Sequence, residues 1–237
     1  MSVSVCMAAF NGAAYIREQI DSILSSPLVD ELIVSDDAST DGTVDIIKSI
    51  ADARLVAIEG PGAGLIRNFE HALSKAKGDV VFLADQDDIW MPNKVERVLS
   101  ALEGVDMVVT DCRVVDGTLK EVCPSFFRLN RSAPGLLRNL AKNGYLGCCM
   151  AVRRGVLDVA LPFPPDIAMH DWWLGLVAER IGRVCFLDET LSLYRRHGGN
   201  ASVSGQRSGY PWLLRLRWRI YLAACLFFRK LPLTRNS

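Results

Sequence analysis

The chain lacks several features that would assign it to a class at once. It has no net charge, because 27 lysine and arginine residues balance 27 aspartate and glutamate residues. It has no apolar run of the roughly 20 residues that a membrane-spanning helix needs. Residues 1–5 show no basic start and no long apolar stretch follows them, so we expect no secretory signal peptide. These absences lead us to expect a cytoplasmic protein.

Familiar cofactor and nucleophile motifs are also missing. There is no GxxxxGK[ST] phosphate loop and no GxSxG nucleophile turn, and the glycines at 60, 62 and 64 do not form GxGxxG. The seven cysteines are odd in number and scattered, with no CxxC pair. We therefore expect buried thiols rather than disulfides or a zinc knuckle.

The composition that remains is that of a globular protein with an uneven charge distribution. Half of the 237 residues are hydrophobic and 23% are charged, which excludes a disordered chain and suits one large domain or two small ones. From Gln206 onward there are seven basic residues and no acidic ones. The preceding 205 residues carry 20 basic and 27 acidic residues, so an acidic body is followed by a basic tail. We expect no nucleic-acid partner.

The first half of the chain alternates short apolar runs with longer helical patterns. Strands are expected at 3–7, 31–35, 54–58 and 79–84, and helices at 13–24, 43–50, 65–77 and 93–102. This order predicts right-handed crossovers and an α/β fold with a mostly parallel central sheet and helices on both faces. Ligands of such sheets bind beyond the carboxyl ends of the strands.

The second half is less regular. We expect further strands near 106–111, 147–152 and 184–187, a hairpin over 114–122, and a helix over 171–181. Residues 113–146 show no pattern that we can interpret. Neither a repeat nor a linker indicates a domain boundary.

Two adjacent acidic residues, Asp36 and Asp37, follow the second expected strand. Their charges repel each other unless a donor binds them. The nearby Asp41 and Thr43 are explained as turn and helix-cap residues, but capping does not account for the pair. A nucleobase N–H or a ribose hydroxyl would supply the donor, so we expect a nucleotide-like ligand here.

Three carboxylates, Asp85, Asp87 and Asp88, follow the fourth expected strand. Hard oxygen ligands at this density favour Mg²⁺ or Mn²⁺. A calcium-binding EF-hand loop is excluded, because Trp90 stands where that loop needs glycine. A solvated acidic turn, with Asp88 or Asn93 capping the next helix, is the alternative.

Taken together, these and later motifs resemble those of the family 2 glycosyltransferases. The DQDDIW sequence at 85–90 is most similar to the bacterial rhamnosyltransferase branch. The resemblance extends from about residue 3 to residue 202, and its motifs lie at 9–12, 36–43, 67–68, 85–90, 147–150, 170–173 and 194–200.

The resemblance implies a GT-A fold that binds a nucleotide-diphosphate sugar together with Mn²⁺ or Mg²⁺. It implies a catalytic domain over 1–204, with a nucleotide-binding half at about 1–104 and an acceptor half at about 105–204, followed by the tail at 205–237. By the same resemblance Asp87 binds the metal. The nucleotide contacts that it implies are Ala8, Phe10, Asn11, Asp36, Asp37, Arg67 and Asp85.

Asp171 is the residue for which the resemblance implies catalysis. Inverting transfer needs one base beside the acceptor hydroxyl, and the His-Asp-Trp-Trp motif at 170–173 matches the acidic catalytic motif of the family. From the residues alone, Asp171 is equally well a helix N-cap. The neighbouring Trp172 and Trp173 are expected to contact the acceptor.

A late motif combines arginine, histidine and glycine. By the resemblance, His197 is a metal ligand or a diphosphate contact. Arg195 and Arg196 suit the diphosphate oxygens of the donor, and the following glycines allow close approach of the backbone. A lone histidine is more often structural, which is the alternative.

The basic tail is rich in aromatic residues, and we expect an amphipathic helix at 210–231. Arg215, Arg219, Arg229 and Lys230 fall within one arc of about 100° on a helical wheel. Cations interleaved with aromatic residues suit an anionic membrane surface, where the enzyme would meet a lipid-linked acceptor. A helix packed on the domain is the alternative.

We therefore expect an inverting, metal-dependent glycosyltransferase that acts in cell-surface polysaccharide synthesis on the inner face of the membrane, with rhamnose as one candidate sugar and a saccharide or lipid-linked acceptor. A sugar nucleotidyltransferase and a non-catalytic membrane-associated scaffold are the alternatives. The donor base, the linkage and the oligomeric state stay open.

Overall fold

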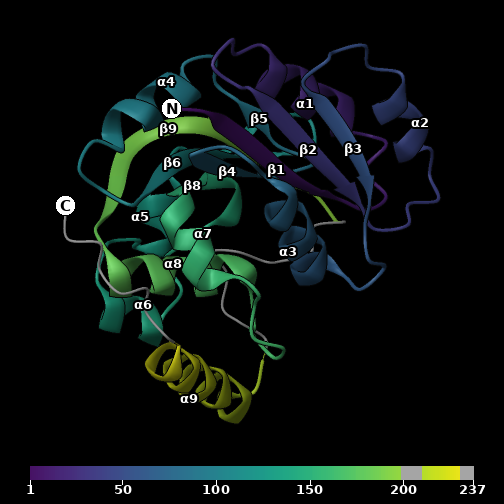
Figure 1. Ribbon diagram of the computed structural model, residues 1–237. Coiled ribbons are helices and arrows are strands. Elements are labelled where there is room, and N and C mark those ends of the chain that lie inside the picture. The colour runs from purple at the N-terminus through teal and green to yellow at the C-terminus, as the bar shows by residue number, and fades with distance from the viewer. Residues whose placement is uncertain (199–209, 230–237) are drawn as a thin grey trace.

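A computed structural model describes residues 1–198 and 210–229 of the chain (Figure 1). The expected boundary between residues 204 and 205 lies outside the described residues, as do Gly199, Asn200 and Lys230.

The described residues form a nine-stranded sheet in the order β3-β2-β1-β4-β8-β6-β9-β5, with β7 paired to β6. The strands are β1 (Val3–Ala9), β2 (Glu31–Asp36), β3 (Leu55–Glu59), β4 (Val80–Asp85), β5 (Ile89–Trp90), β6 (Met107–Asp116), β7 (Glu121–Cys123), β8 (Met150–Arg153) and β9 (Val184–Arg196). Strands β1 to β4 are mutually parallel, as are β6 and β9, whereas β5, β7 and β8 run antiparallel to their neighbours. The expected mostly parallel sheet is confirmed.

Helices cover both faces of this sheet (Figure 1). One face packs against α1 (Ile16–Leu24), α2 (Thr43–Lys48) and α4 (Lys94–Ala101). The other packs against α3 (Leu65–Lys75), α7 (Arg154–Ala160) and α8 (His170–Ile181). Three further helices are α5 (Phe126–Asn130), α6 (Leu136–Ala141) and α9 (Trp212–Phe228), and a 3₁₀ turn spans Gly147–Cys149. The α/β arrangement predicted from the sequence is confirmed.

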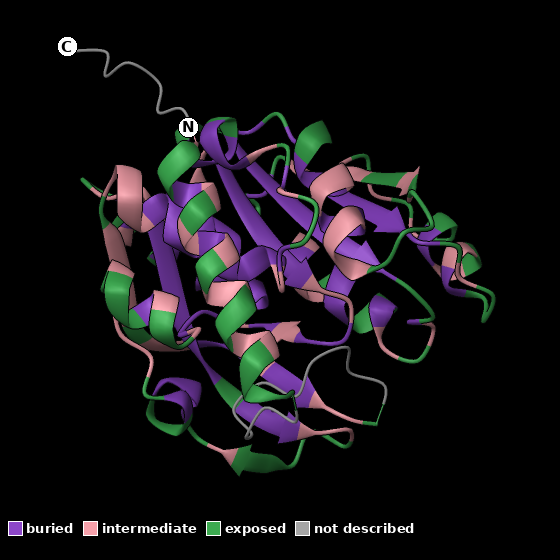
Figure 2. Ribbon diagram, turned by 90° about the horizontal axis from the view of Figure 1, so that it is seen from below, coloured by how far each residue is buried: buried purple, intermediate pink, exposed green. Residues whose placement is uncertain are grey.

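Alternating side chains of β1 divide the interior into two cores. Val5 and Met7 pack with α1, whereas Cys6 and Ala8 pack with α3 and α8. All seven residues of β1 are buried, which is typical of a parallel strand covered on both faces (Figure 2). The carboxyl ends of the central strands are therefore held between two packed layers.

The second half departs from the expected pattern. The hairpin is confirmed, but its first strand, β6, has ten residues, and β9 has thirteen where a run of four was expected. The pairing of β6 with β9 changes register between Thr110 and Asp111, opposite the polar stretch at 188–190. This irregularity breaks the apolar pattern within a continuous strand. The uninterpreted region around 113–146 contains α5 and α6.

The expected C-terminal amphipathic helix is α9, and it packs on the domain. Leu222 and Leu226 are buried in the core that contains α8. Two arginines of the cationic arc, Arg219 and Arg229, donate from their guanidinium groups to carbonyls of the domain, as expected for the alternative of a helix packed on it. Among the described residues there is no helix that combines the length and the apolar character needed to cross a membrane.

Candidate active site

A cavity of about 450 Å³ opens at the carboxyl ends of β1 and β4. This is the edge at which parallel sheets bind ligands. Both halves of the chain line it, because the beginning of α8 faces the ends of these strands. Six of the predicted site residues line the cavity: Ala8, Phe10, Asp37, Asp85, Asp87 and Asp171.

The acidic sequence after β4 concentrates negative charge at this cavity. Burial, and then the charges of Asp87 and Asp171, raise the pKa of Asp85 to about 8. Asp88 is buried behind it, and burial followed by the charge of Asp87 raises its pKa as well. One oxygen of Asp88 accepts a 3.0 Å hydrogen bond from the backbone N–H of Arg195. Such crowding of carboxylates suits a bound cation.

The structure brings the two predicted metal ligands together. His197 Nε2 lies 2.8 Å from Asp87 Oδ2, although β9 and the sequence after β4 are more than a hundred residues apart. A carboxylate and an imidazole suit Mn²⁺, and carboxylates also bind Mg²⁺. A second group with ligand atoms within 4.8 Å of one another contains Asp85, Asp88 and Cys148. Because Asp87 lines the cavity and Cys148 is fully buried, the Asp87–His197 pair fits a catalytic cation better.

Gln86 joins the ends of β1 and β4, and sequence analysis did not single it out. Its Oε1 accepts from the backbone N–H of Phe10 and its Nε2 donates to the Phe10 carbonyl, both at 2.9 Å. A Cβ on Gly12 would lie 2.2 Å from Gln86 Oε1, so glycine is required there. The sequence feature that could have indicated Gln86 is its position between two of the clustered carboxylates, Asp85 and Asp87.

The chain itself supplies the donors that Asp36 and Asp37 were expected to take from a ligand. Asp37 accepts from the backbone N–H groups of Gly62 and Gly64, each at 2.7 Å. Both glycines have positive φ angles, of 64° and 85°, which other residues rarely adopt. Asp36 accepts from the backbone N–H and the hydroxyl of Ser39 at 2.9 and 2.5 Å. Asp37 therefore shapes the loop that forms one wall of the cavity, whereas Asp36 does not line the cavity.

Four other predicted nucleotide or donor contacts lie outside the cavity lining: Asn11, Arg67, Arg195 and Arg196. Asn11 connects two loops, because its backbone N–H donates to Ser39 and its Oδ1 accepts from Thr40. The guanidinium of Arg67 pairs with Glu70 and donates to the carbonyl of Pro165.

Arg195 is 4% exposed and its guanidinium has partners within the chain. It donates to Glu18 Oε2 at 2.6 Å and to the backbone carbonyl of Asp87 at 2.8 Å. The guanidinium of Arg196 lies 5.8 Å from the centre of the Tyr194 ring. The structure thus assigns Arg195 to holding the Asp87 loop in place.

The two tryptophans predicted to contact the acceptor belong to the core. Trp172 Nε1 donates to the Asn139 carbonyl at 2.7 Å, and Trp173 Nε1 donates to the Ala160 carbonyl at 3.0 Å. Both rings are buried, and neither lines the cavity. The two buried rings anchor α8 in the core, and α8 in turn positions Asp171, which precedes them.

Asp171 lies in the first turn of α8 and faces the cavity. It is not the N-cap, because α8 begins at His170 and Met169 occupies the cap position. Its Oδ1 accepts from the backbone N–H of Trp172 at 2.6 Å and from Asn143 Nδ2 at 3.3 Å. Burial nevertheless raises its pKa to about 6. A carboxylate with this pKa is a suitable general base near neutral pH.

His170, also absent from the predicted site, forms an apolar wall of the cavity. Its ring stacks on Phe69 at 4.0 Å, and burial lowers its pKa to about 3, so the imidazole is neutral. Neither ring nitrogen has a hydrogen-bond partner among residues 1–198 and 210–229. A Cβ on Gly147 would lie 2.9 Å from His170 Nε2, which explains the glycine.

Comparisons with known proteins agree with this architecture. The chain is 29% identical over 212 residues to UDP-Glc:alpha-D-GlcNAc-diphosphoundecaprenol beta-1,3-glucosyltransferase WfaP of Escherichia coli, covering 85% of this chain and 80% of the relative. It is structurally similar to residues 1–349 of S. aureus TarS in complex with UDP-GlcNAc, with a TM-score of 0.75, 20% identity, and coverage of 98% of this chain and 68% of that one.

A second structural neighbour is the mannosyltransferase PcManGT from Pyrobaculum calidifontis in complex with GDP-Man and Mn²⁺. It aligns with a TM-score of 0.63 and 20% identity, over 97% of this chain and 65% of that chain. These neighbours confirm the GT-A fold. A sequence model of one family, glycosyl transferase family 2, matches residues 4–160, about two thirds of the chain. The chain belongs to glycosyl transferase family 2.

Proposed function

We propose that this glycosyltransferase moves a sugar, with inversion, from a nucleotide-diphosphate donor to a hydroxyl of a saccharide or lipid-linked acceptor. One observation carries the proposal: Asp171, with its raised pKa, faces the same cavity as Asp85 and Asp87. A base on one wall and a cation-binding acidic cluster on another are the two elements that inverting transfer requires.

In this proposal the wall built by β1 and the Asp37 loop binds the nucleotide. Phe10 is 56% exposed and lines the cavity, so its ring is free to pack against a base. Asp87 and His197 would hold Mn²⁺ or Mg²⁺. When bound, the cation neutralises the charge that develops on the departing diphosphate. Arg195 keeps the Asp87 carbonyl, and with it the ligand loop, in position.

Asp171 removes the proton from the acceptor hydroxyl as the hydroxyl oxygen attacks the anomeric carbon. The bond between that carbon and the diphosphate oxygen breaks on the opposite face, and the electron pair leaves with the nucleoside diphosphate. The His170 ring and the buried Trp172 support the turn that carries this carboxylate. Because the His170 imidazole is neutral, it places no positive charge beside the Asp171 carboxylate.

The proposal extends to the sugar that is transferred and to the acceptor that receives it. WfaP is named for a UDP-glucose donor and a diphosphoundecaprenol-linked acceptor, and TarS was solved with UDP-GlcNAc. These names support a nucleotide-sugar donor and a lipid-linked acceptor. Rhamnose is proposed from the 85–90 motif.

The experiment that tests the function identifies the nucleotide and the released product. Thermal-shift measurements with UDP, dTDP and GDP, each with and without Mn²⁺, should give a stabilisation that depends on one base and on the metal. The matching nucleotide sugars are then incubated with lipid-linked acceptors. Release of nucleoside diphosphate supports the proposal, release of pyrophosphate indicates a nucleotidyltransferase, and the absence of any nucleotide binding indicates a scaffold.

A further inference from the structure

Two arginines, one in α9 and one directly after it, point toward the protein. Arg219 Nε donates to the Ala141 carbonyl at 2.8 Å, and its guanidinium lies 5.8 Å from the centre of the Trp172 ring. Arg229 Nε donates to the Val159 carbonyl at 2.6 Å and its guanidinium lies 5.9 Å from the Trp173 ring. These arginines fasten α9 to the domain, so they are not available as the membrane-facing surface.

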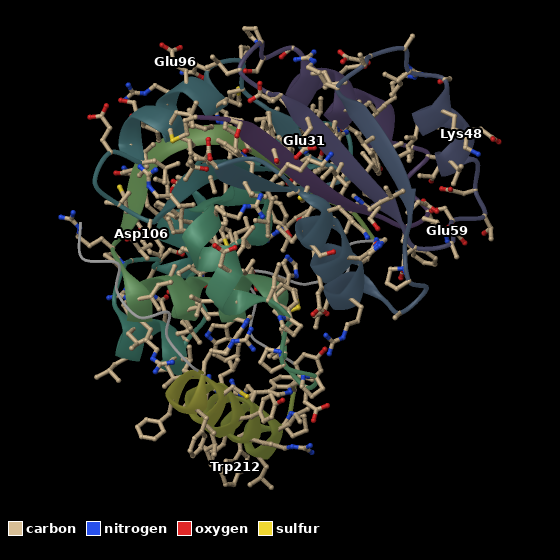
Figure 3. All side chains as sticks on the ribbon, viewed as in Figure 1. Glu31, Lys48, Glu59, Glu96, Asp106 and Trp212 are labelled. Atoms are coloured by element: carbon tan, nitrogen blue, oxygen red, sulfur yellow. The ribbon has the colours of Figure 1, made fainter. Side chains whose placement is uncertain are left out.

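The opposite side of α9 is apolar and exposed. It carries an apolar stripe made of Trp212, Leu213, Leu216, Ile220, Phe227 and Phe228, each between 45% and 79% exposed. Most of these residues recur at helical spacings of three or four, on the side opposite Leu222 and Leu226. Figure 3 shows the outer side chains of α9, near the labelled Trp212, pointing away from the domain.

An exposed apolar stripe of this size indicates an interaction surface. Arg217 is the only exposed charged residue between 210 and 229. A second copy of α9 offers no anion to pair with it, because the sequence from Gln206 to Ser237 contains no acidic residue. Lipid phosphates supply that anion, and acyl chains accept the aromatic and aliphatic side chains. The charge of the surface therefore favours a bilayer over the pairing of α9 with a second α9.

We propose that α9 lies in the plane of an anionic bilayer, with the apolar stripe inserted below the headgroups and Arg217 paired with their phosphates. The stripe supplies most of the affinity and the cation adds to it. In this orientation the apolar side of α9, rather than the cationic arc, faces the lipid. The proposal is independent of which sugar is transferred.

The position of α9 gives this contact a consequence for the active site. Helix α9 packs on α6 and α8, and the first turn of α8 contains Asp171. The Arg219 guanidinium lies 5.8 Å from the ring centre of Trp172, which belongs to that turn. Docking through α9 therefore brings the acceptor half of the cavity, rather than β3 at the far edge of the sheet, close to the lipid surface (Figure 1).

The test is vesicle co-sedimentation of the full chain, with vesicles of phosphatidylcholine alone and with about one third phosphatidylglycerol. The wild type should bind the anionic vesicles, and the double variant Leu216→Glu/Ile220→Glu should lose at least roughly tenfold in partition coefficient. Leu28→Glu, which makes the same change at a 44% exposed position in the turn before β2, should bind like the wild type. Unchanged melting temperatures exclude misfolding as the cause.

A spectroscopic readout identifies the inserted residue. Brominated acyl chains should quench part of the tryptophan fluorescence, and Trp212→Phe should remove most of that part, because Trp90, Trp172 and Trp173 are buried and Trp218 is partly buried against the core. The proposal fails if the wild type stays in the supernatant with anionic vesicles. It also fails if the stripe variants bind as the wild type does, or if light scattering shows that the stripe variants abolish a dimer while the wild type binds no lipid.

Discussion

Asp37 and Asp171 line the same cavity, but the chain treats their carboxylates in opposite ways. Asp37 accepts short hydrogen bonds from the backbone N–H groups of Gly62 and Gly64. Asp171 accepts one short bond from Trp172 and a longer one from Asn143, and burial raises its pKa to about 6. One carboxylate is used to shape a loop, while the other keeps its affinity for a proton.

This difference separates the loop after β2 from the start of α8. After β2, polar side chains bind backbone N–H groups of neighbouring loops and so preorganise a wall of the cavity before any ligand arrives. In the second half, α8 holds His170 and Asp171 in an apolar environment, where hydration no longer favours their charged forms. An acidic residue at the edge of a sheet is therefore a catalytic candidate only when its local partners leave it reactive.

Asp171→Asn should have the largest effect, because it removes the base while keeping the size and most of the hydrogen bonding of the side chain. We expect transfer to fall by about a thousandfold or more, with donor affinity nearly unchanged. Initial rates and donor titrations measure the two quantities. Asp158→Asn, an exposed change on α7, is the matched control. Substantial turnover by Asp171→Asn would contradict the assignment of Asp171 as the general base.

The first half of the fold was predictable from the sequence because each strand there is a continuous apolar run followed by glycine or polar residues. The expected strands and helices at 3–104 agree with β1 to β4 and α1 to α4 within a few residues. The two-residue strand β5 was missed, since two residues carry no periodic signal. Motif positions also predicted which strand ends approach the cavity.

The contacts in the cavity were less predictable. The Asp87–His197 pair depends on β9, thirteen residues long, continuing past a change of register, and its side chains meet across 110 positions of sequence. The resemblance to a family gave that pair, whereas periodicity did not. The sequence also could not show that Arg195 and Trp173 are enclosed, because enclosure depends on neighbours from distant segments. Sequence analysis could therefore single out these aromatic and charged residues, but it could not predict where they lie in the folded protein.

Asp37→Asn tests the other side of the comparison, with a smaller expected effect. The amide keeps one acceptor oxygen but loses the charge and presents a donor to the N–H groups of Gly62 and Gly64. The free energy of unfolding should fall by about 1–3 kcal/mol, because hydrogen bonds to a charged group are replaced. Donor affinity should fall roughly tenfold while kcat changes less, which denaturant unfolding and donor titration measure.

Asp45→Asn on α2 is the control for this variant, since Asp45 is exposed and lies in the same half of the chain. Unchanged stability and unchanged donor affinity in Asp37→Asn would contradict a loop-shaping role. A loss of kcat equal to that of Asp171→Asn would break the comparison, because both carboxylates would then act on the reaction itself.

The pH dependence of transfer should report Asp171. Burial favours its neutral form, so the folded-state pKa of about 6 lies above the ordinary value, and the base is half protonated near pH 6. Transfer at saturating donor should fall about tenfold per unit below pH 6, where Asp171 gains its proton. Steady-state rates from pH 5 to pH 8 measure this profile, with Asp158→Asn again as control. A rate that does not change across this range would contradict the assignment.

His170→Phe should have the smallest effect at neutral pH. Its ring nitrogens have no hydrogen-bond partner in the described parts of the chain, so a phenyl ring keeps the stacking on Phe69 and leaves no group unsatisfied. We expect the free energy of unfolding at pH 7 to change by less than about 1 kcal/mol.

The pKa of His170 is lowered to about 3 by burial, so the unfolded chain binds its proton first as the pH falls. Wild-type stability is therefore lost from about pH 6.5 downward, and at pH 5 the variant should be more stable than the wild type by about 2 kcal/mol. Equal pH dependence of unfolding in the two proteins would mean that His170 is protonated in the folded state, and the apolar wall beside Asp171 would then be a charged one.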